Sequence, residues 1–418
     1  MKKNVWIMNH YAGSMYFSQG GRHYSFAKYL KRAGYEPVIF CANSRHGTPE
    51  PWFPNEALWH EHIAEELEVP FLFVRARTYM GNGKQRLLNV LDFYRNVKKA
   101  AKEYAAAHGK PDVIYASSVH PLTLVAGLSL AKCFGVECIC EMRDLWPESI
   151  VAYGIAGLHN PAVIALRQLE KWIYKKADEV VFTMEGAYDY IVERGWEKDV
   201  PRSKVHYINN GVDLEQFDYN KIHFLVEDTV LNDPDTFKVV YTGSIRKVNN
   251  LGLLLDASKC VKNPRIQFLI WGDGDERKVL EQRVQEECIS NVTFKGSVEK
   301  KYVPSIVSHA DLNFAHNTFS SLFRFGISFN KLFDYFAAGR PVLCDFPCPY
   351  NPAITYRAGI EVLTAQPQQI AKAIDAMAAL PEQEWQIYSA NARRAAENYD
   401  FKQLTEKVIS IIESIPQN

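Results

Sequence analysis

The sequence lacks the cysteine spacing of a zinc site or of a disulfide-bonded domain. Its eight cysteines contain no C-x-x-C pair, and the closest are Cys138 with Cys140 and Cys344 with Cys348. In a chain of 418 residues, this spacing favours reduced thiols and a cytoplasmic protein over a disulfide frame. We therefore expect neither disulfides nor a bound metal.

The sequence also lacks a long apolar run and an excess of charge of either sign. The most apolar stretch, 122–140, is broken by Lys132 and Glu137, so no segment is predicted to span a bilayer. Lysine plus arginine and aspartate plus glutamate each number 48, which leaves no overall field to attract nucleic acid or a membrane. We expect no nucleic-acid partner. An apolar strand at 5–8 follows the N-terminus directly, which predicts no cleavable leader.

What the sequence does contain is a repeated alternation of apolar strands and helices. A strand at 4–8, a loop with glycines, a helix at about 22–33 and a strand at 37–41 are typical of the start of a doubly wound parallel sheet. The alternation restarts with strands at 237–241, 266–271, 292–295 and 311–315. We therefore predict an α/β fold of two Rossmann-like domains. No G-x-G-x-x-G motif is present, so a dinucleotide site is not indicated.

The domain boundaries follow from composition. Residues 214–237 are rich in Asp, Asn and Pro and show little periodicity, which is typical of a linker. We predict an N-terminal domain at 1–213, this linker, a C-terminal domain at 238–384, and C-terminal helices at 385–418.

The stretch 323–341 contains the strongest candidate binding residues. Ser328 is suited to cap a short helix that Gly339 and Pro341 would end. Lys331 lies in the first turn, where free N–H groups and the helix dipole already favour an anion such as a phosphate. Asp334, on the same face as Asn330, could accept hydrogen bonds from two sugar hydroxyls. An amphipathic helix with a solvated Lys and Asp fits these residues about equally well.

Polar residues also follow strands in the N-terminal half, where ligands of open parallel sheets collect. His120 follows the strand at 112–116, although a lone histidine is more often structural than catalytic. Arg143 and Asp144 follow the strand at 137–142, and we interpret this loop as acceptor recognition in preference to a salt-bridged structural loop. A turn at 20–21 fits a ligand loop and a structural turn about equally. Its residues are Gly20 and Gly21, with Arg22 next to them at the start of the helix.

The segment 75–110 is basic, with leucines and aromatic residues between its lysines and arginines. A basic amphipathic helix can lie on an anionic membrane face, but it is more often an ordinary covering helix of a sheet. We favour the covering helix by a modest margin.

Several of these stretches resemble one family. The run F-G-I-S-F-N-K-L-F-D-Y-F-A-A-G-R-P at 325–341, Arg-Asp-Leu-Trp-Pro at 143–147 and Asn-Gly-Val-Asp at 210–213 resemble motifs of glycosyltransferase family 4. The resemblance is to a branch that makes bacterial surface polysaccharides (O-antigen, capsule), including the N-acetyl-L-fucosamine transferase type. The motif Y-M-G-N-G-K-Q-R at 79–86 is similar to a loop of the same branch. Asp334 and Gly326 stand where the family usually has two glutamates, for the donor ribose and the donor sugar.

The resemblance implies the GT-B fold, with two domains facing a central cleft and a last helix that crosses back to the first domain. It also implies a retaining transfer that needs no metal and no other cofactor. The candidate catalytic residues are His120, Lys331 and Arg246, and the candidate acceptor-binding residues are Gly20, Gly21, Arg22, Arg143 and Asp144. The candidate donor-binding residues are Gly243, Ser244, Arg246, Gly272, Arg324, Gly326, Ile327, Ser328, Asn330, Lys331 and Asp334.

The function implied is transfer of a sugar from a nucleotide sugar to a glycan. We expect a UDP-linked donor, with an N-acetylated amino sugar as one candidate, and a polyprenyl-diphosphate-linked acceptor. We also expect a cytoplasmic protein, for which a contact of 75–110 with the inner membrane face is the less favoured of the two interpretations of that segment. Two alternatives remain: a UDP-sugar 2-epimerase-like isomerase on the same fold, and a nucleotide-sugar-binding protein without catalysis.

Overall fold

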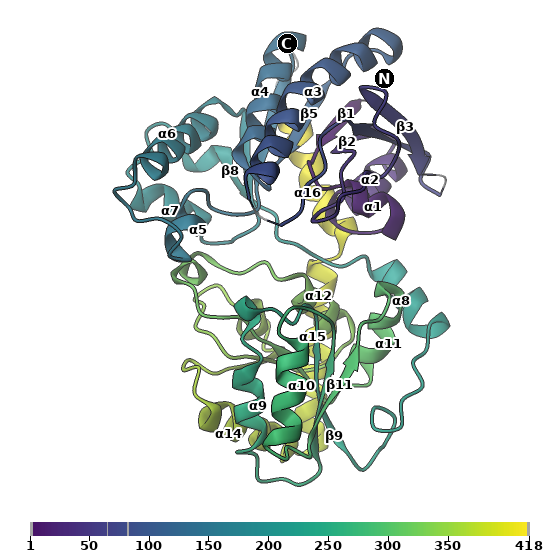
Figure 1. The fold of residues 1–418 in the computed structure, drawn as a ribbon, viewed down its shortest axis with the longest axis vertical. Coiled ribbons are helices and arrows are strands. Elements are labelled where there is room, and N and C mark those ends of the chain that lie inside the picture. Colours follow the sequence, from purple (N-terminus) through teal and green to yellow (C-terminus); the bar gives the residue numbers. More distant parts are fainter. Residues whose placement is uncertain (1–2, 65, 82, 416–418) are drawn as a thin grey trace. The chain divides into compact units, whose positions relative to one another are not determined.

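The computed structural model describes residues 3–64, 66–81 and 83–415 (Figure 1). The chain divides into two compact units. Unit 1 comprises Met1–Asn209 and Phe401–Asn418, and unit 2 comprises Asn210–Asp400. Each unit is an α/β domain around one parallel sheet, so the prediction of two Rossmann-like domains is confirmed. No helix within the described ranges is long and apolar enough to cross a lipid bilayer.

Unit 1 is built around a sheet of eight strands in its described part, in the order β3-β4-β2-β1-β5-β6-β7-β8. Neighbouring strands pair in parallel except the edge strand β3, which is antiparallel to β4. The central strands read as continuous apolar runs because helices cover both faces of a parallel sheet. The strands are β1 Asn4–Met8, β2 Glu36–Ala42, β3 Trp59–Ala64, β4 Val69–Val74, β5 Val113–Ser117, β6 Glu137–Met142, β7 Glu179–Phe182 and β8 Val205–Tyr207.

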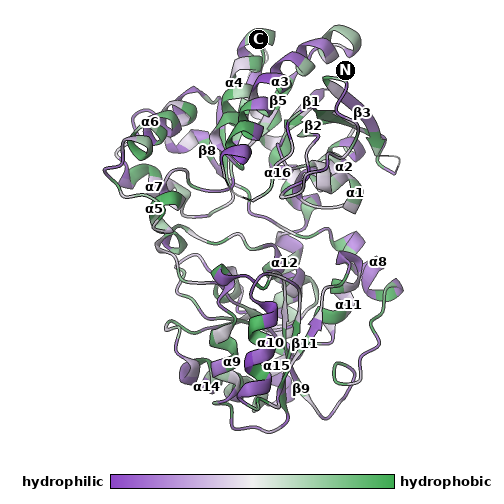
Figure 2. Ribbon diagram, viewed as in Figure 1, coloured by the Kyte–Doolittle hydropathy of each residue, from purple (hydrophilic) through white to green (hydrophobic). Residues whose placement is uncertain are grey.

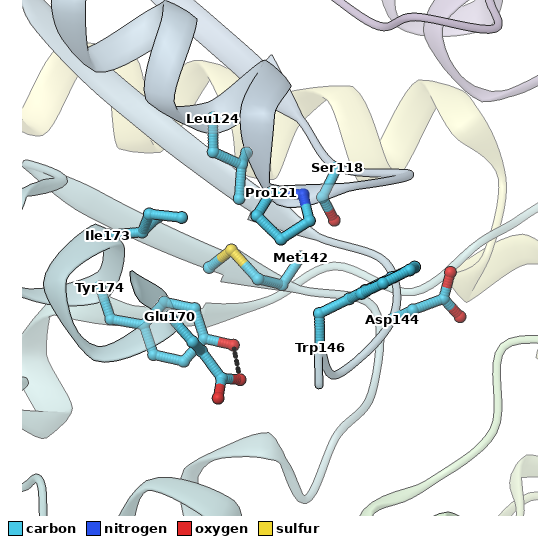
Figure 3. Close-up of a pocket in the computed structure, with 9 residues that line it drawn as sticks. All are labelled: Ser118, Pro121, Leu124, Met142, Asp144, Trp146, Glu170, Ile173 and Tyr174. Atoms are coloured by element: carbon cyan, nitrogen blue, oxygen red, sulfur yellow. Dashed lines mark hydrogen bonds between the residues drawn. The ribbon is translucent and has the colours of Figure 1, made fainter. Parts of the chain in front are cut away.

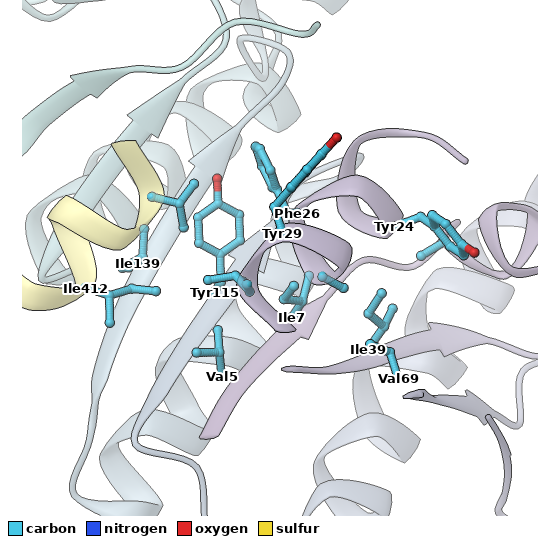
Figure 4. Close-up of a cluster of buried hydrophobic side chains, with 14 of the residues drawn as sticks. Val5, Ile7, Tyr24, Phe26, Tyr29, Ile39, Val69, Tyr115, Ile139 and Ile412 are labelled. Atoms are coloured by element: carbon cyan, nitrogen blue, oxygen red, sulfur yellow. The ribbon is translucent and has the colours of Figure 1, made fainter. Parts of the chain in front are cut away.

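The last helix of the chain, α16, belongs to the core of unit 1. Its buried Phe401 contacts Phe26 of α2 edge-on, with ring centroids 5.7 Å apart. Figure 4 shows Ile412 of α16 in the same cluster as Ile139 and Tyr115. The helices of this unit are α1 Gly13–Ser18, α2 Arg22–Arg32, α3 Lys84–His108, α4 Pro121–Phe134, α5 Glu148–Ala152, α6 Pro161–Lys176, α7 Ala187–Glu193, η1 Arg202–Lys204 and α16 Phe401–Ser414.

Unit 2 contains a parallel sheet with six strands in its described part, ordered β11-β10-β9-β12-β13-β14. Its strands are β9 Phe237–Thr242, β10 Ile266–Trp271, β11 Val292–Gly296, β12 Leu312–Ala315, β13 Val342–Cys344 and β14 Gly359–Glu361. The covering helices are amphipathic, and Figure 2 shows hydrophilic and hydrophobic turns alternating along α10. The helices are α8 Leu214–His223, η2 Lys247–Asn249, α9 Gly252–Ser258, α10 Arg277–Glu286, η3 Lys300–Tyr302, α11 Val303–Ser308, η4 Ser321–Phe325, α12 Asn330–Ala337, α13 Pro352–Thr355, α14 Pro367–Ala378 and α15 Glu382–Asn398.

The observed boundaries differ from the predicted ones at two places. The predicted linker 214–237 contains helix α8, whose first turn is capped by the Asp213 carboxylate, 3.2 Å from the Gln216 amide. The predicted C-terminal segment 385–418 is divided between the two units. Helix α15 stays in unit 2, where Arg393 pairs with Asp218 of α8 and donates to the Ala337 carbonyl of α12, and only α16 returns to unit 1.

Candidate functional site

Lys331 lies at the carboxyl end of the unit 2 sheet, in the first turn of α12. Its ammonium donates a hydrogen bond to the hydroxyl of Tyr241 (2.8 Å) and lies 3.9 Å from the centre of that ring. Burial lowers the pKa of Lys331 to about 7, and the charge of Asp345 opposes this shift. Desolvation favours the neutral form of this amine, and an anionic ligand would restore its charge. The free backbone N–H groups of the first helical turn favour an anion at the same place.

Of the predicted donor-binding glycines, Gly243 lies beside Lys331 and Gly272 lies against Gly243. A Cβ on Gly243, which directly follows β9, would lie 3.2 Å from the Lys331 nitrogen. Gly272, which follows β10, has φ 150°, and a Cβ there would lie only 1.8 Å from the carbonyl oxygen of Gly243. The loops after β9 and β10 therefore touch backbone to backbone, and Gly272 is required by that packing. The structure brings Lys331, Gly243 and Gly272 together, as predicted for a site at the strand ends.

Asp334 lies one turn further along α12 and is half-buried. Burial raises the pKa of its carboxyl, and the charge of Lys300 opposes the shift. Asn330, at the start of the helix, is exposed. Gly326 (φ 111°) and Ile327 are buried in the turn that joins η4 to α12. These four candidates therefore lie in α12 or in the turn directly before it.

The prediction that Ser328 caps α12 is wrong. The residue before the helix is Phe329, and no side chain caps the first turn. The Ser328 hydroxyl instead accepts from the backbone N–H of Asn210 (3.3 Å), and the Ser328 carbonyl accepts from the Asn210 side-chain amide (2.9 Å). A contact with a residue far away in sequence has replaced the local cap.

Of the remaining donor candidates, Ser244 is joined to Lys331 through Tyr241, whose hydroxyl donates to the Ser244 carbonyl (2.9 Å). The Ser244 hydroxyl donates to the Asn249 side chain (2.9 Å). Arg246 is exposed in the loop between β9 and η2. Arg324 is also exposed, donates to the Ser321 carbonyl (2.6 Å) and lies 4.2 Å from the ring centre of Phe325.

Sequence reasoning missed a buried pair at the same sheet edge. His316 directly follows β12 and Asp345 directly follows β13, and the two strands are paired in parallel. The Nδ1 atom of His316 lies 2.5 Å from an Asp345 oxygen, and its Nε2 atom lies 3.1 Å from the Asn250 carbonyl. The position of both residues one step past an apolar strand is the signal that would have found them.

In unit 1, Arg22 is part of a buried network around Glu141. The Glu141 carboxylate accepts from Arg22 (2.7 Å), Tyr115 (2.6 Å) and Ser117 (2.6 Å), and it lies 3.0 Å from His23. Arg22 also donates to the Ile208 and Asn209 carbonyls, at 2.8 and 2.5 Å. These contacts hold α2 against β6 and the end of β8, so the guanidinium predicted to bind the acceptor has a structural role in the described contacts.

The other predicted acceptor residues lie in two loops of unit 1. Gly21 has φ 103°, as a glycine turn requires, and Gly20 precedes it. Arg143 follows β6, and its backbone N–H donates to the Ser118 hydroxyl (3.1 Å). Asp144 is exposed and lines a small hollow with Trp146 of the same loop (Figure 3).

The floor of this hollow includes an acidic residue that the sequence did not suggest. Glu170 of α6 is buried, and its two carboxyl oxygens contact the hydroxyls of Tyr174 (2.7 Å) and Tyr190 (2.8 Å), the first of them drawn in Figure 3. Burial raises the pKa of Glu170 to about 8.

His120 directly precedes helix α4 and is buried. Its Nε2 atom lies 3.0 Å from Nδ1 of His10, which belongs to the loop after β1. Burial and the nearby charge of Arg86 lower the pKa of His120 to about 4, so the ring is neutral at ordinary pH. His120 is therefore a hydrogen-bonding group of fixed charge state.

Comparison with known proteins identifies the family. Residues 22–216 match the family model Glycosyltransferase Family 4, and residues 236–379 match the model Glycosyl transferases group 1. The two matches together span most of the chain. It belongs to the glycosyltransferases. No curated protein matches the chain in a sequence search.

Solved structures of other proteins share the fold of this glycosyltransferase. Sucrose-phosphate synthase from Thermosynechococcus elongatus is 19% identical, with a TM-score of 0.71 over 99% of this chain and 98% of that one. Trehalose 6-phosphate synthase from Burkholderia multivorans is 14% identical, with a TM-score of 0.71 over 99% of each chain. The Anabaena protein HepE in complex with UDP and glucose is 14% identical, with a TM-score of 0.66 over 99% of this chain and 100% of that one. The predicted GT-B fold is confirmed.

The basic segment 75–110 of the glycosyltransferase contains helix α3. Met80, Leu87 and Leu88 are exposed near its start, and Val90, Phe93 and Val97 are buried in unit 1. Asn82 of the Y-M-G-N-G-K-Q-R motif lies outside the described residues. The helix thus covers the sheet and also presents apolar side chains at its beginning, and the membrane contact stays a prediction.

Within the described part of the chain, no group of three or more His, Cys, Asp or Glu side chains is arranged to hold a metal ion. The expectation that transfer needs no metal also stays a prediction.

Proposed function

We propose that this glycosyltransferase moves a sugar, with retention of configuration, from a UDP-linked donor to a glycan. The observation that carries the proposal is the half-buried Lys331 beside Gly243, which packs on Gly272, at the carboxyl end of the unit 2 sheet. The likeness to HepE, solved with UDP and glucose and with UDP-glucose, supports a UDP-linked donor.

In this proposal the diphosphate of the donor lies against Lys331 and the open backbone at Gly243. Charge-assisted hydrogen bonds to phosphate contribute about 1.5–3 kcal/mol each, so the Lys331 contact alone would raise donor affinity by roughly 10- to 150-fold. Arg246 and Arg324 are exposed and would add charge if their loops move to the ligand. Asp334 would accept from the ribose hydroxyls, in place of the longer glutamate of the family.

The transfer would proceed on one face of the sugar. The bond between the anomeric carbon and the diphosphate oxygen breaks while the acceptor hydroxyl oxygen forms the new bond to that carbon. The acceptor proton passes to the leaving diphosphate, and Lys331 stabilises the negative charge that develops there. His120 would contact the donor sugar, and Arg143 and Asp144 would face the acceptor.

We further propose that the acceptor is a polyprenyl-diphosphate-linked glycan at the cytoplasmic face of the membrane, in bacterial surface polysaccharide synthesis. The support is the motif at 143–147 and the basic segment 75–110, with exposed Met80, Leu87 and Leu88. An N-acetylated amino sugar is our candidate for the group transferred.

The decisive experiment incubates the enzyme with a panel of UDP-sugars, with a polyprenyl-diphosphate-linked sugar and with the same sugar free of lipid. We expect UDP release and a new glycosidic bond of retained configuration, seen by NMR, with the lipid-linked acceptor. Equal rates on the lipid-free acceptor would contradict the acceptor proposal alone.

The same assay without acceptor tests the two alternatives. A 2-epimerase-like isomerase would change the sugar nucleotide by itself, and a binding protein would retain UDP without any turnover. The two glycosyltransferase family matches favour transfer over both.

A further inference from the structure

A line of hydrogen bonds inside unit 1 ends at His120. The Asn89 amide nitrogen of α3 donates to the Arg77 carbonyl (2.5 Å) and to the Ser44 hydroxyl (2.8 Å). The Asn89 oxygen lies 2.8 Å from Nε2 of His10, and Nδ1 of His10 lies 3.0 Å from Nε2 of His120. Asn89 and His10 are fully buried, and His120 is 7% exposed.

The donor-to-acceptor direction of these hydrogen bonds is fixed at the Asn89 end. A backbone carbonyl can only accept, so the nitrogen of Asn89 must face Arg77 and its oxygen must face His10. Nε2 of His10 therefore carries the hydrogen. A neutral imidazole has one hydrogen, which leaves Nδ1 of His10 as an acceptor.

Both rings are held neutral. Burial lowers the pKa of each histidine, and the charge of Arg86 acts on both in the same direction. His46 also lowers the pKa of His10. Because Nδ1 of His10 accepts, Nε2 of His120 must donate, and its Nδ1 must carry the lone pair.

That last lone pair has no partner within the described residues. Nδ1 of His120 is buried and makes no hydrogen bond there. A buried acceptor left unsatisfied destabilises a structure, and an O–H group of a ligand would remove that cost. A ligand that only accepts hydrogen bonds, such as a phosphate oxygen, would not.

We propose that Asn89 and His10 are positioning residues that hold His120 in its Nε2–H form, so that Nδ1 accepts a hydrogen bond from a hydroxyl of the transferred sugar. The inference rests on the proposed function, because it assumes that His120 meets the donor sugar. The proposal also assigns a specificity, because the sugar must carry an O–H donor at this position. A deoxy or fluoro group there would weaken the binding of the transition state.

The experiment combines a spectroscopic and a kinetic measurement on the full chain. Long-range ¹H–¹⁵N NMR of histidine-labelled protein, with His120 assigned through the His120→Asn variant, should show the Nε2–H form of His120. Addition of UDP-glucose should shift the Nδ1 resonance, and UDP alone should not.

In the kinetic measurement, His10→Phe should lower kcat/KM for sugar transfer by about 3- to 10-fold and leave the UDP affinity unchanged. His10→Gln offers both an acceptor and a donor and should restore most of the rate. The matched control is His62→Phe in β3, whose ring stacks on Phe53 at 3.7 Å outside this line. Circular dichroism and thermal melting identify a variant that has merely failed to fold.

The outcomes separate the two proposals. An Nδ1–H form of His120 in the unchanged protein would overturn the inference whatever the enzyme does. Equal transfer rates for His10→Phe and the unchanged protein would overturn the positioning role while leaving the function intact. Absence of transfer with every UDP-sugar, together with no NMR shift on UDP-glucose, would overturn the proposed function and with it the sugar contact.

Discussion

Each unit has ionisable residues near the carboxyl end of its sheet. In unit 1 this residue is Glu141 of β6, and in unit 2 the residues are Lys331 and Asp334 of the neighbouring helix α12. Glu141 is buried and contacts four side chains, including the guanidinium of Arg22. Lys331 and Asp334 are half-buried, and the only described hydrogen bond of the Lys331 ammonium is to Tyr241.

The difference shows how a charge inside a protein can be used. The partners of Glu141 hold its pKa well below the usual range despite burial, so its charge is compensated within unit 1 and serves the fold. Burial shifts the pKa values of Lys331 and Asp334 toward the neutral forms, so these groups gain from a ligand of complementary chemistry. Charge variants should therefore change stability in unit 1 and binding in unit 2.

The largest expected effect is on stability. Glu141→Gln keeps the shape of the side chain but leaves the buried guanidinium of Arg22 without a counter-charge, which should cost roughly 3–5 kcal/mol of unfolding free energy. Urea unfolding measures this loss of unfolding free energy. Glu66→Gln, at an exposed position of unit 1, is the matched control and should change little. A loss below about 1 kcal/mol for Glu141→Gln would contradict a structural role for this network.

Next is nucleotide binding in unit 2. Lys331→Ala removes the ammonium proposed to meet the diphosphate, so calorimetric UDP affinity should fall by about 1.5–3 kcal/mol, while folding is retained. Lys262→Ala, at an exposed position of the same unit, should bind UDP like the unchanged protein. Unaltered UDP affinity in both Lys331→Ala and Asp334→Ala would remove the basis of the donor site.

A smaller effect concerns Glu170, a buried carboxyl of unit 1 whose contacts are two tyrosine hydroxyls. Its pKa of about 8 lies above the ordinary value of 4.5, so its neutral form is favoured by folding. The stability that this group contributes is therefore lost as pH rises from 4.5 through about 8, with a slope of at most about 1.4 kcal/mol per pH unit.

Glu170→Gln cannot ionise, so urea unfolding at pH 6 and pH 8 should show a flatter dependence for this variant than for the unchanged protein. Identical slopes for the two proteins would mean that Glu170 does not titrate in this range.

The smallest effect is the pH dependence of donor binding. With a pKa of about 7, Lys331 loses its charge as pH rises, so UDP-glucose affinity should fall by roughly tenfold at most between pH 6 and pH 8. UDP-glucose is used because its diphosphate does not titrate there. Lys331→Arg stays charged, and its affinity should be independent of pH. A pH-independent affinity in the unchanged protein would mean that Lys331 is charged before the ligand arrives.

The sequence predicted those parts of the fold that depend on local pattern. Apolar runs located β1, β9 and β10, and the left-handed Gly339 (φ 63°) ends α12 as expected. The prediction for Ser328 failed because a tertiary contact with Asn210 replaced the local cap. Helix α8 was missed because its few apolar residues form a weak periodic pattern.

The candidate residues were predictable only where their position at a strand end or in the first turns of a helix carried the information. Gly243 and Gly272 were proposed because they follow strands whose ends converge in a parallel sheet, and Lys331 because it lies in the first turn of a helix. The partners of Arg22 lie more than a hundred residues away along the chain, and no spacing rule reveals them. His316 and Asp345 also follow paired strands, so the same rule applied to every strand would have singled them out.

Unit 2 occupies a continuous stretch of the chain, whereas unit 1 is assembled from both ends of it. The two ends of unit 2 meet, because the Val212 N–H donates to the Tyr399 carbonyl (3.0 Å) and Val212 forms a bridge with Asp400. A gene fragment for 210–400 should thus yield a self-contained domain for crystallography or ligand screening. A fragment for 1–209 would leave uncovered the apolar surface on which α16 packs. Its recombinant form needs 401–415 supplied as a fused or separate peptide.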